Sequence, residues 1–234
     1  MSQKLENMKD SWKDSIGKNQ IIGVCKFCNK PISGLDLSFN GMHYKCDIEV
    51  SRLKTLGIDE RFWNLPNFKI EPGNKVAYEA TEEFIKDSKR GLLFFGQAGT
   101  GKTHLAVKIA LETKLKCKFV KIPRLLMELK ANFDGSSFEN ENIINKLSNM
   151  PLLILDDLGA EKASEWVAET IYVLIDERYG KMLPTIITSN YEPSLLAERL
   201  GDRILSRLSE MCRFIEIKTS DKRQEVVKNV YQSK

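Results

Sequence analysis

The feature that most constrains the fold is the segment 96–103, which reads G-Q-A-G-T-G-K-T and matches G-x-x-x-x-G-K-[ST] at every fixed position. A short apolar run at 92–95 precedes it, and apolar residues at helical spacing follow it over 102–116. Glycine lets the backbone turn tightly and approach a phosphate closely, and the N-terminus of the following helix adds partial positive charge. The sequence therefore predicts a strand, a phosphate-binding loop and a helix, in that order.

We expect this loop to bind the phosphates of ATP. Lys102 would reach the β- and γ-phosphates, and the hydroxyl of Thr103 would be a ligand of Mg²⁺. A dinucleotide-binding loop is excluded, because no third glycine completes G-x-G-x-x-G after Gly99 and Gly101. The remaining alternative is a glycine turn without a nucleotide. The predicted nucleotide contacts in the loop are Gly96, Gln97, Ala98, Gly99, Thr100, Gly101, Lys102 and Thr103.

Two further apolar runs end in polar residues. The run at 152–155 leads into Asp156 and Asp157, which predicts a buried parallel strand with two carboxylates at the ligand edge of the sheet. We expect Asp156 to hold Mg²⁺ through water and Asp157 to orient or deprotonate the attacking water. The run at 185–189 ends at Asn190, which would lie beside the γ-phosphate if its strand neighbours the phosphate-loop strand.

Composition narrows the class of protein. The chain of 234 residues is 42% hydrophobic and 29% charged, with a net charge of +4, as in an ordinary globular protein. No apolar run approaches the length of a membrane span, and the first residues have no apolar signal region. We therefore expect a cytoplasmic protein without a membrane partner. Its five cysteines then indicate a metal site or free thiols before disulfides.

A compact cysteine and histidine pattern lies near the N-terminus. Cys25 and Cys28 form C-x2-C, and His43 and Cys46 form H-x2-C fourteen residues later. This Cys₃His set has the spacing of structural Zn²⁺ sites, and four protein ligands leave no open position for catalysis. Unligated thiols are the alternative. We expect a zinc-binding domain over 1–60 that draws much of its folding free energy from the metal.

Hydrophobic periodicity predicts an α/β protein. We place the domain boundary near residue 60 and expect 59–73 to be a linker that lies along the second domain, 61–234. Residues 132–142 are predicted to be a loop or a helix break. The predicted strands are 92–95, 117–122, 152–155, 185–190 and 213–217, and the predicted helices are 48–56, 76–88, 102–116, one from 125, 143–147, 163–179, 195–200, 201–208 and 221–231.

The motifs together resemble those of AAA+ ATPases. More narrowly, GTGKTHLA at 99–106, DDLGAE at 156–161 and TSNY at 188–191 look like the helicase loaders of the DnaC/DnaI type, whose branch includes the transposition helper IstB. The resemblance implies an AAA+ P-loop domain over 61–234, with a parallel five-stranded sheet flanked by helices and a reduced lid. It also implies that the zinc module binds the replicative hexameric helicase, which ATP-dependent loading then delivers onto single-stranded DNA for replication.

The same resemblance assigns roles to single residues. Asn190 would be the sensor-1 residue, and His104 would contact the nucleotide from the motif that contains the phosphate loop. Arg207 would be an arginine finger that acts on a neighbouring subunit, with Arg203 beside it. Arg223 would be the sensor-2 residue. An arginine finger that acts on a neighbouring subunit implies that copies of the chain assemble with one another.

Two other functions remain open: an ATPase that assists a transposase, and a small-molecule kinase. The zinc module favours the loader over the transposase helper. Arginines at i, i+4 fit a subunit interface better than a kinase lid. We expect single-stranded DNA to pass over 125–146, and a solvated basic helix is the alternative there. Its predicted contacts are Lys121, Arg124, Lys130 and Phe133.

Overall fold

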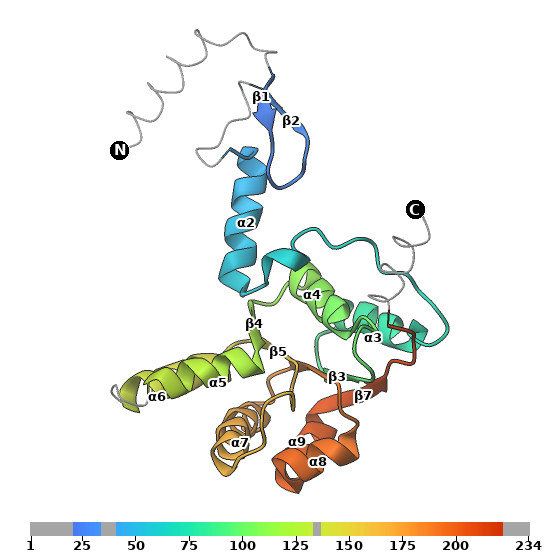
Figure 1. Ribbon diagram of the computed structural model, residues 1–234. Helices are drawn as coiled ribbons and strands as arrows, with labels where there is room; N and C mark the ends of the chain where they lie inside the picture. The colour runs from blue at the N-terminus through green and yellow to red at the C-terminus, as the bar shows by residue number, and fades with distance from the viewer. Residues whose placement is uncertain (1–20, 34–40, 133–136, 222–234) are drawn as a thin grey trace. The chain divides into compact units, whose positions relative to one another are not determined.

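The computed structural model describes residues 21–33, 41–132 and 137–221 (Figure 1). The chain divides into two compact units between Pro66 and Asn67, beyond the boundary expected near residue 60. Trp63 explains why 61–66 belong to the first unit. Its indole Nε1 donates to the carbonyl of Ile58 at 2.9 Å, and its ring lies 6.5 Å from that of Phe27.

The N-terminal unit is a short hairpin followed by a helix. Strands β1 (Ile21–Val24) and β2 (Pro31–Ser33) pair in antiparallel fashion. Helix α2 (Tyr44–Leu56) follows and ends at Gly57, and a 3₁₀ turn occupies Glu60–Phe62. The helix begins four residues before the predicted 48, so that two residues of the cysteine and histidine pattern lie at its start. Among the described residues of this unit, the buried hydrophobic side chains are Cys25, Ile32, Val50, Leu53 and Ile58.

The C-terminal unit is built on a parallel sheet, as predicted. Its strands lie in the order β4-β5-β6-β3-β7, and every neighbouring pair is parallel. Strands β5 and β6 are buried at each position, which explains their uninterrupted apolar sequences. The strand bounds are β3 (Gly91–Phe95), β4 (Cys117–Lys121), β5 (Leu152–Asp156), β6 (Thr185–Ser189) and β7 (Cys212–Glu216).

Helices cover both faces of this sheet. Figure 1 shows α3 (Lys75–Lys86) and α4 (Lys102–Glu112) on one side, and α7 (Glu165–Gly180), α8 (Pro193–Leu200) and α9 (Asp202–Met211) on the other. Helices α5 (Ile122–Ala131) and α6 (Ser137–Ser148) add their apolar residues to the core on the side of α7. A five-stranded parallel sheet flanked by helices was the predicted architecture.

Two predicted boundaries on the α7 side are wrong. Helix α5 begins at Ile122, with Pro123 inside its first turn, where a missing N–H costs no helical hydrogen bond. The segment 132–142, predicted as a loop or a helix break, separates α5 from α6 but is helical again from residue 137, and Asn140 of α6 donates its side-chain N–H to the carbonyl of Leu129 at 2.9 Å. The predicted helix 221–231, and with it the reduced lid, lies almost entirely outside the described residues.

A buried arginine links four elements of the C-terminal unit. Arg178 of α7 is fully buried, and burial lowers its pKa to about 10. Its guanidinium donates to the hydroxyl of Thr185 at 2.9 Å and to the carbonyls of Leu147, Met150 and Pro184 at 3.0, 2.7 and 2.7 Å. It therefore holds the end of α6 and the start of β5 against the start of β6.

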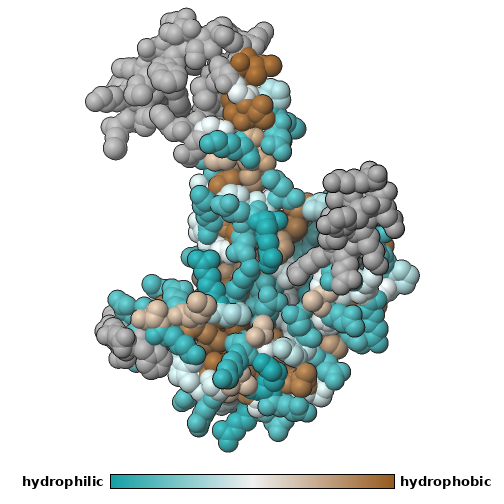
Figure 2. Space-filling model, viewed as in Figure 1, coloured by the Kyte–Doolittle hydropathy of each residue, from teal (hydrophilic) through white to brown (hydrophobic). Residues whose placement is uncertain are grey.

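Polar residues cover much of the C-terminal unit. Figure 2 shows hydrophilic side chains over most of its visible face, with apolar ones gathered in smaller groups. Within the described ranges, none of the helices has the length and hydropathy needed to cross a bilayer.

Candidate nucleotide site and metal centre

The phosphate-loop sequence lies between β3 and α4, where the pattern requires it. At two of its glycines, a side chain would clash with neighbouring atoms. Gly101 has φ of +98°, and a Cβ there would lie 2.9 Å from the ring of Phe68. A Cβ on Gly96 would lie 2.4 Å from the carbonyl oxygen of Ile217. The loop is thus a tight backbone turn that only these glycines permit.

Lys102 places its ammonium inside this loop. The residue is 5% exposed, and Nζ donates to the carbonyls of Gly96 at 2.8 Å and Gln97 at 2.6 Å. The hydroxyl of Thr100 also donates to the carbonyl of Gln97 at 2.9 Å, which closes the turn. Because Lys102 lies at the start of α4, its positive charge adds to that of the helix N-terminus, where binding of a phosphate is favoured.

Thr103 and Asp156 meet at the carboxyl edge of the sheet. The Thr103 hydroxyl donates to Oδ1 of Asp156 at 2.9 Å, although the two residues are 53 positions apart. Asp156 is fully buried, and its Oδ2 has no hydrogen-bond partner in the described part of the chain. Burial, followed by the charge of Asp157, raises the pKa of Asp156. A buried carboxylate oxygen without a partner is costly, and a divalent cation or its water relieves that cost.

Asp157 and Asn190 lie at the same edge. Strand β6 neighbours both β5 and β3, with Ser189 in register with Phe95 just before the loop. Asn190 follows directly and is exposed, so the condition set for its place beside the γ-phosphate is met. Asp157 follows β5 in a left-handed conformation, with φ of +61°. Their roles in hydrolysis remain predictions.

Three aromatic rings, those of Phe68, Tyr78 and His104, lie together beside the phosphate loop. The sequence did not predict that they would meet there. The ring of Phe68 stacks on that of Tyr78 at 5.8 Å and meets the ring of His104 edge-on at 5.2 Å. Phe68 also covers Gly101, as described above. The aromatic residues of 59–73 indicated a segment in contact with the second domain. Nothing in the sequence showed that Phe68 would meet the phosphate loop.

The two candidate interface arginines have different surroundings. Arg203 of α9 is exposed. Arg207 forms an ion pair with Asp176 of α7, donates to the hydroxyl of Tyr172 at 2.8 Å and lies over the rings of Tyr172 and Tyr179. The hydrogen bond to Asp176, together with the negative charge of that carboxylate, raises the pKa of Arg207. Arg207 is thus engaged within its own chain.

Two predicted residues fall outside the described ranges. These are Arg223, the predicted sensor-2 residue, and Phe133, the predicted stacking face for DNA. Both remain predictions from the sequence.

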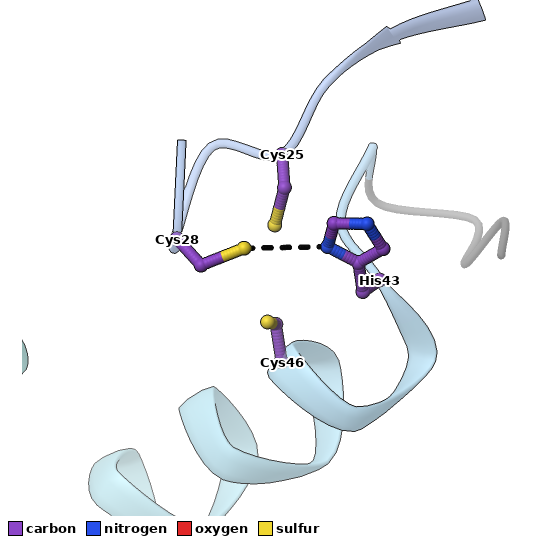
Figure 3. A group of neighbouring side chains, drawn as sticks. All are labelled: Cys25, Cys28, His43 and Cys46. Carbon is purple, nitrogen blue, oxygen red and sulfur yellow. Dashed lines mark hydrogen bonds between the residues drawn. The ribbon is translucent and has the colours of Figure 1, made fainter. Parts of the chain in front are cut away.

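The four predicted zinc ligands meet in the N-terminal unit (Figure 3). Cys25 and Cys28 come from the turn between β1 and β2, and His43 and Cys46 come from the start of α2. One donor atom of each lies within 4.8 Å of the others. A tetrahedral Zn²⁺ with bonds of about 2.0 to 2.3 Å needs its donors roughly 4 Å apart. The residues therefore fit the ion.

Hydrogen bonds already orient the ligands. Nε2 of His43 donates to the carbonyl of Pro31 at 3.0 Å, which leaves Nδ1 facing Cys28 Sγ at 3.3 Å. This is the outer-shell arrangement that fixes the tautomer of a metal-binding imidazole. Burial opposes ionisation of Cys25, but backbone hydrogen bonds, that of Cys28 first, lower its thiol pKa to about 6. Burial raises the pKa of Cys46 to about 12.

Comparisons with known proteins concern mainly the C-terminal unit. A family model described as IstB-like ATP binding protein matches residues 67–229. The replicative helicase loader DnaC of Escherichia coli (strain K12) is 27% identical over 149 residues, which are 61% of each chain. The replicative helicase loader DnaI of Bacillus subtilis (strain 168) is 30% identical over 135 residues, which are 54% of this chain and 43% of that protein.

A solved structure supports the fold. The crystal structure of the DnaC helicase loader superposes with a TM-score of 0.61 and 33% identity, over 68% of this chain and 100% of that one. This likeness and the strand order confirm the predicted AAA+ fold. The chain spans 61% of the length of the Escherichia coli loader that it matches. The Cys₃His cluster lies outside the family match, so it rests on its own geometry.

Proposed function

The chain belongs to the family of IstB-like ATP-binding proteins, and we propose that it hydrolyses ATP to load a replicative DNA helicase onto single-stranded DNA. The contact of Thr103 with Asp156, across 53 positions, carries the ATP part of this proposal. The Cys₃His cluster in a separate unit, and relatives named as replicative helicase loaders, support the loading part. The same relatives favour a loader over a transposase helper.

The proposed chemistry assigns one task to each group at the sheet edge. Backbone N–H groups of the loop and the Lys102 ammonium hold the phosphates. Thr103 and Asp156 would hold Mg²⁺, which when bound neutralises developing charge on the phosphates. Asp157 would orient the attacking water, and Asn190 would donate to the γ-phosphate from the end of β6. These assignments use residues that the fold brings to one edge, since β3, β5 and β6 end there together.

We assign the nucleotide base to the aromatic group beside the loop. Phe68 stacks on Tyr78, meets His104 and touches Gly101 at the entrance to α4. Flat rings next to a phosphate site suit a purine base, because aromatic faces stack well on one another. This assignment also gives His104 the nucleotide contact expected for it.

The N-terminal unit is the proposed helicase-binding part. Zn²⁺ held by the Cys₃His cluster would stabilise a module with little core of its own. Among the described residues of this unit, the apolar side chains that are more than half exposed are Ile21, Val24, Tyr44 and Ile48. Figure 2 shows strongly hydrophobic residues at its surface. An apolar surface on so small a module suits contact with another protein.

Helix α5 is the proposed contact for single-stranded DNA. Arg124 and Lys130 are exposed on it, and the Lys130 ammonium lies 5.0 Å from the centre of the Trp166 ring. A cation beside an aromatic side chain suits a strand of phosphates and bases. Lys121 lies in register with Asp156, where its charge acts on that carboxylate. The DNA proposal therefore rests on the other two residues.

A closed circle of single-stranded DNA tests the loading step. A ring helicase cannot thread onto a strand without ends, so unwinding of an oligonucleotide annealed to the circle reports loading. We expect the chain with ATP to stimulate unwinding by the replicative helicase of its own organism. Lys102→Ala should fail, whereas the exposed Lys114→Ala should act like the parent protein. Capture of a transposase, with no binding to the helicase, would establish the alternative.

A further inference from the structure

Thr188 touches both acidic residues at the end of β5. It is the penultimate residue of β6 and is fully buried. Its hydroxyl donates to Oδ1 of Asp156 at 2.7 Å and accepts the backbone N–H of Asp157 at 3.0 Å. A threonine hydroxyl has a single proton, so one donated and one accepted bond define its orientation completely.

The adjoining hydrogen bonds attach β6 to the turn that follows β5. The N–H of Leu158 donates to the carbonyl of Thr188 at 2.9 Å. The hydroxyl of Ser189 donates to the carbonyl of Leu158 at 2.7 Å. Three successive residues, 156 to 158, are therefore held by the end of the strand that leads to Asn190. Any movement of this strand end would be transmitted to the two acidic residues.

These contacts control two features that hydrolysis requires. Oδ1 of Asp156 accepts both the Thr188 and the Thr103 hydroxyls, which leaves Oδ2 as the oxygen without a hydrogen-bond partner among the described residues. The choice of free oxygen is thereby fixed. Asp157 has φ of +61°, a conformation that residues other than glycine seldom adopt and that needs support from its surroundings. The bond to Thr188 supplies that support.

We propose that Thr188 is a positioning residue for ATP hydrolysis, which orients Asp156 toward the metal and holds Asp157 in its left-handed conformation. The inference rests on the proposed function and deepens it. Thr188 acts only through the two aspartates, because its single hydroxyl proton is given to Asp156. It couples the strand of Asn190 to the acidic pair, so that both halves of the site keep a common geometry.

Two substitutions separate the hydroxyl from the shape of the side chain. Thr188→Val keeps the volume and removes both hydrogen bonds, whereas Thr188→Ser keeps the hydroxyl. Thr185→Val is the matched control. Thr185 is buried at the opposite end of the same strand and accepts from Arg178, so its loss should lower the melting temperature without reaching the site.

The first measurement is steady-state hydrolysis. We expect Thr188→Val to lower kcat at least tenfold while KM for ATP changes less than threefold, because the loop that binds the phosphates is untouched. The Mg²⁺ concentration for half-maximal rate should rise several-fold. Thr188→Ser should recover most of the parent kcat. Thr185→Val should keep the parent kcat and Mg²⁺ requirement after correction for the folded fraction.

The second measurement does not need turnover. A fluorescent ATP analogue should bind Thr188→Val and the parent equally in EDTA, and the gain in affinity on adding Mg²⁺ should be several-fold smaller in the variant. If the parent binds the analogue but does not hydrolyse ATP, the proposed function fails and this measurement still decides the role of Thr188. Parent-like Mg²⁺ dependence in Thr188→Val, or a Thr188→Ser variant as impaired as Thr188→Val, would overturn the inference.

Discussion

At the scale of single residues, Lys102 carries the sharpest prediction. Its ammonium is buried in the loop and is the charge that would meet the β- and γ-phosphates. Lys102→Ala should lower the affinity for a fluorescent ATP analogue at least tenfold, because it removes this charge and leaves the loop carbonyls without their donor.

Asp157→Asn should keep the parent affinity for the analogue and lose most hydrolysis. Equilibrium titration and phosphate release measure the two effects, with exposed Lys114→Ala as the control.

A Lys102→Ala protein that binds and hydrolyses ATP like its parent would contradict the nucleotide site. The Asp157→Asn variant tests a different point, namely whether Asp157 acts on the attacking water. Weaker binding there would mean that Asp157 supports the loop rather than the attacking water.

Some site residues were visible in the sequence because their chemistry depends on local spacing. The loop 96–103 and the acidic pair after β5 each lie within a few consecutive residues, so the pattern alone predicts their place at a strand end. Thr188 and Phe68 were not predicted to act. Their contacts join segments that are about 30 residues apart in the chain. A buried threonine in an apolar run otherwise indicates no more than a strand.

At the scale of elements, the sheet was predictable and the helix boundaries were less so. Buried parallel strands have uninterrupted apolar sequences, and β5 and β6 show them clearly. The start of α6 was missed because its first turns are polar, with Glu139 and Glu141 exposed, and such residues suit a loop as well as a solvated helix. The β1–β2 hairpin was also missed, since β2 has only three residues.

Arg178 gives a prediction about how the elements are held together. Arg178→Met keeps an apolar stem but leaves the carbonyls of Leu147, Met150 and Pro184 without their donor. Buried acceptors without partners are costly, so we expect the free energy of unfolding to fall by about 3 kcal/mol. Urea unfolding followed by circular dichroism measures this change. Lys181→Met, one turn beyond it at an exposed position, should change stability little.

The site should be unaffected where Arg178→Met remains folded. ATP-analogue affinity below the unfolding transition should equal that of the parent, because Arg178 lies at the opposite edge of the sheet from the phosphate loop. A stability loss no larger than that of Lys181→Met would show that water or neighbouring groups replace the guanidinium.

At the scale of the whole molecule, the zinc cluster and the ATP-binding unit should unfold separately. The freshly purified chain should contain about one Zn²⁺ per molecule, since four donor atoms meet at a single place. We expect two unfolding transitions and assign the one at lower temperature to the unit 1–66. Removal of Zn²⁺ with a strong chelator, or the substitution Cys25→Ser, should abolish this transition. The transition of the C-terminal unit should remain. Calorimetry and metal analysis measure both.

Cys117→Ala is the matched control for the zinc prediction. Cys117 is a buried cysteine of β4, outside the cluster, so its substitution should leave the zinc content unchanged. Freshly purified protein without zinc, or zinc that survives in Cys25→Ser together with His43→Ala, would contradict the metal site.

Assembly is the last prediction, and it rests on Arg207. Within one chain its guanidinium is paired with Asp176 and bonded to the Tyr172 hydroxyl. If it acts as an arginine finger, these contacts must exchange for the γ-phosphate of a neighbouring subunit. Guanidinium suits both partners, because its planar fork pairs with carboxylate and phosphate oxygens alike. Hydrolysis per molecule should therefore rise with protein concentration, since only assembled subunits receive the arginine.

Mixing two inactive variants distinguishes a finger from an internal clamp. Arg207→Ala keeps its own phosphate loop, and Lys102→Ala keeps its arginine, so each should be inactive alone and the mixture should recover part of the rate. A trans-acting arginine is worth roughly 10³-fold or more in phosphoryl transfer, so even partial recovery is measurable. An internal clamp predicts a lower melting temperature for Arg207→Ala and no recovery on mixing, because the lost contacts to Asp176 and Tyr172 cannot be supplied by another chain. Exposed Arg213→Ala, which removes an ion pair with Glu83 at the surface, should behave like the parent in both assays.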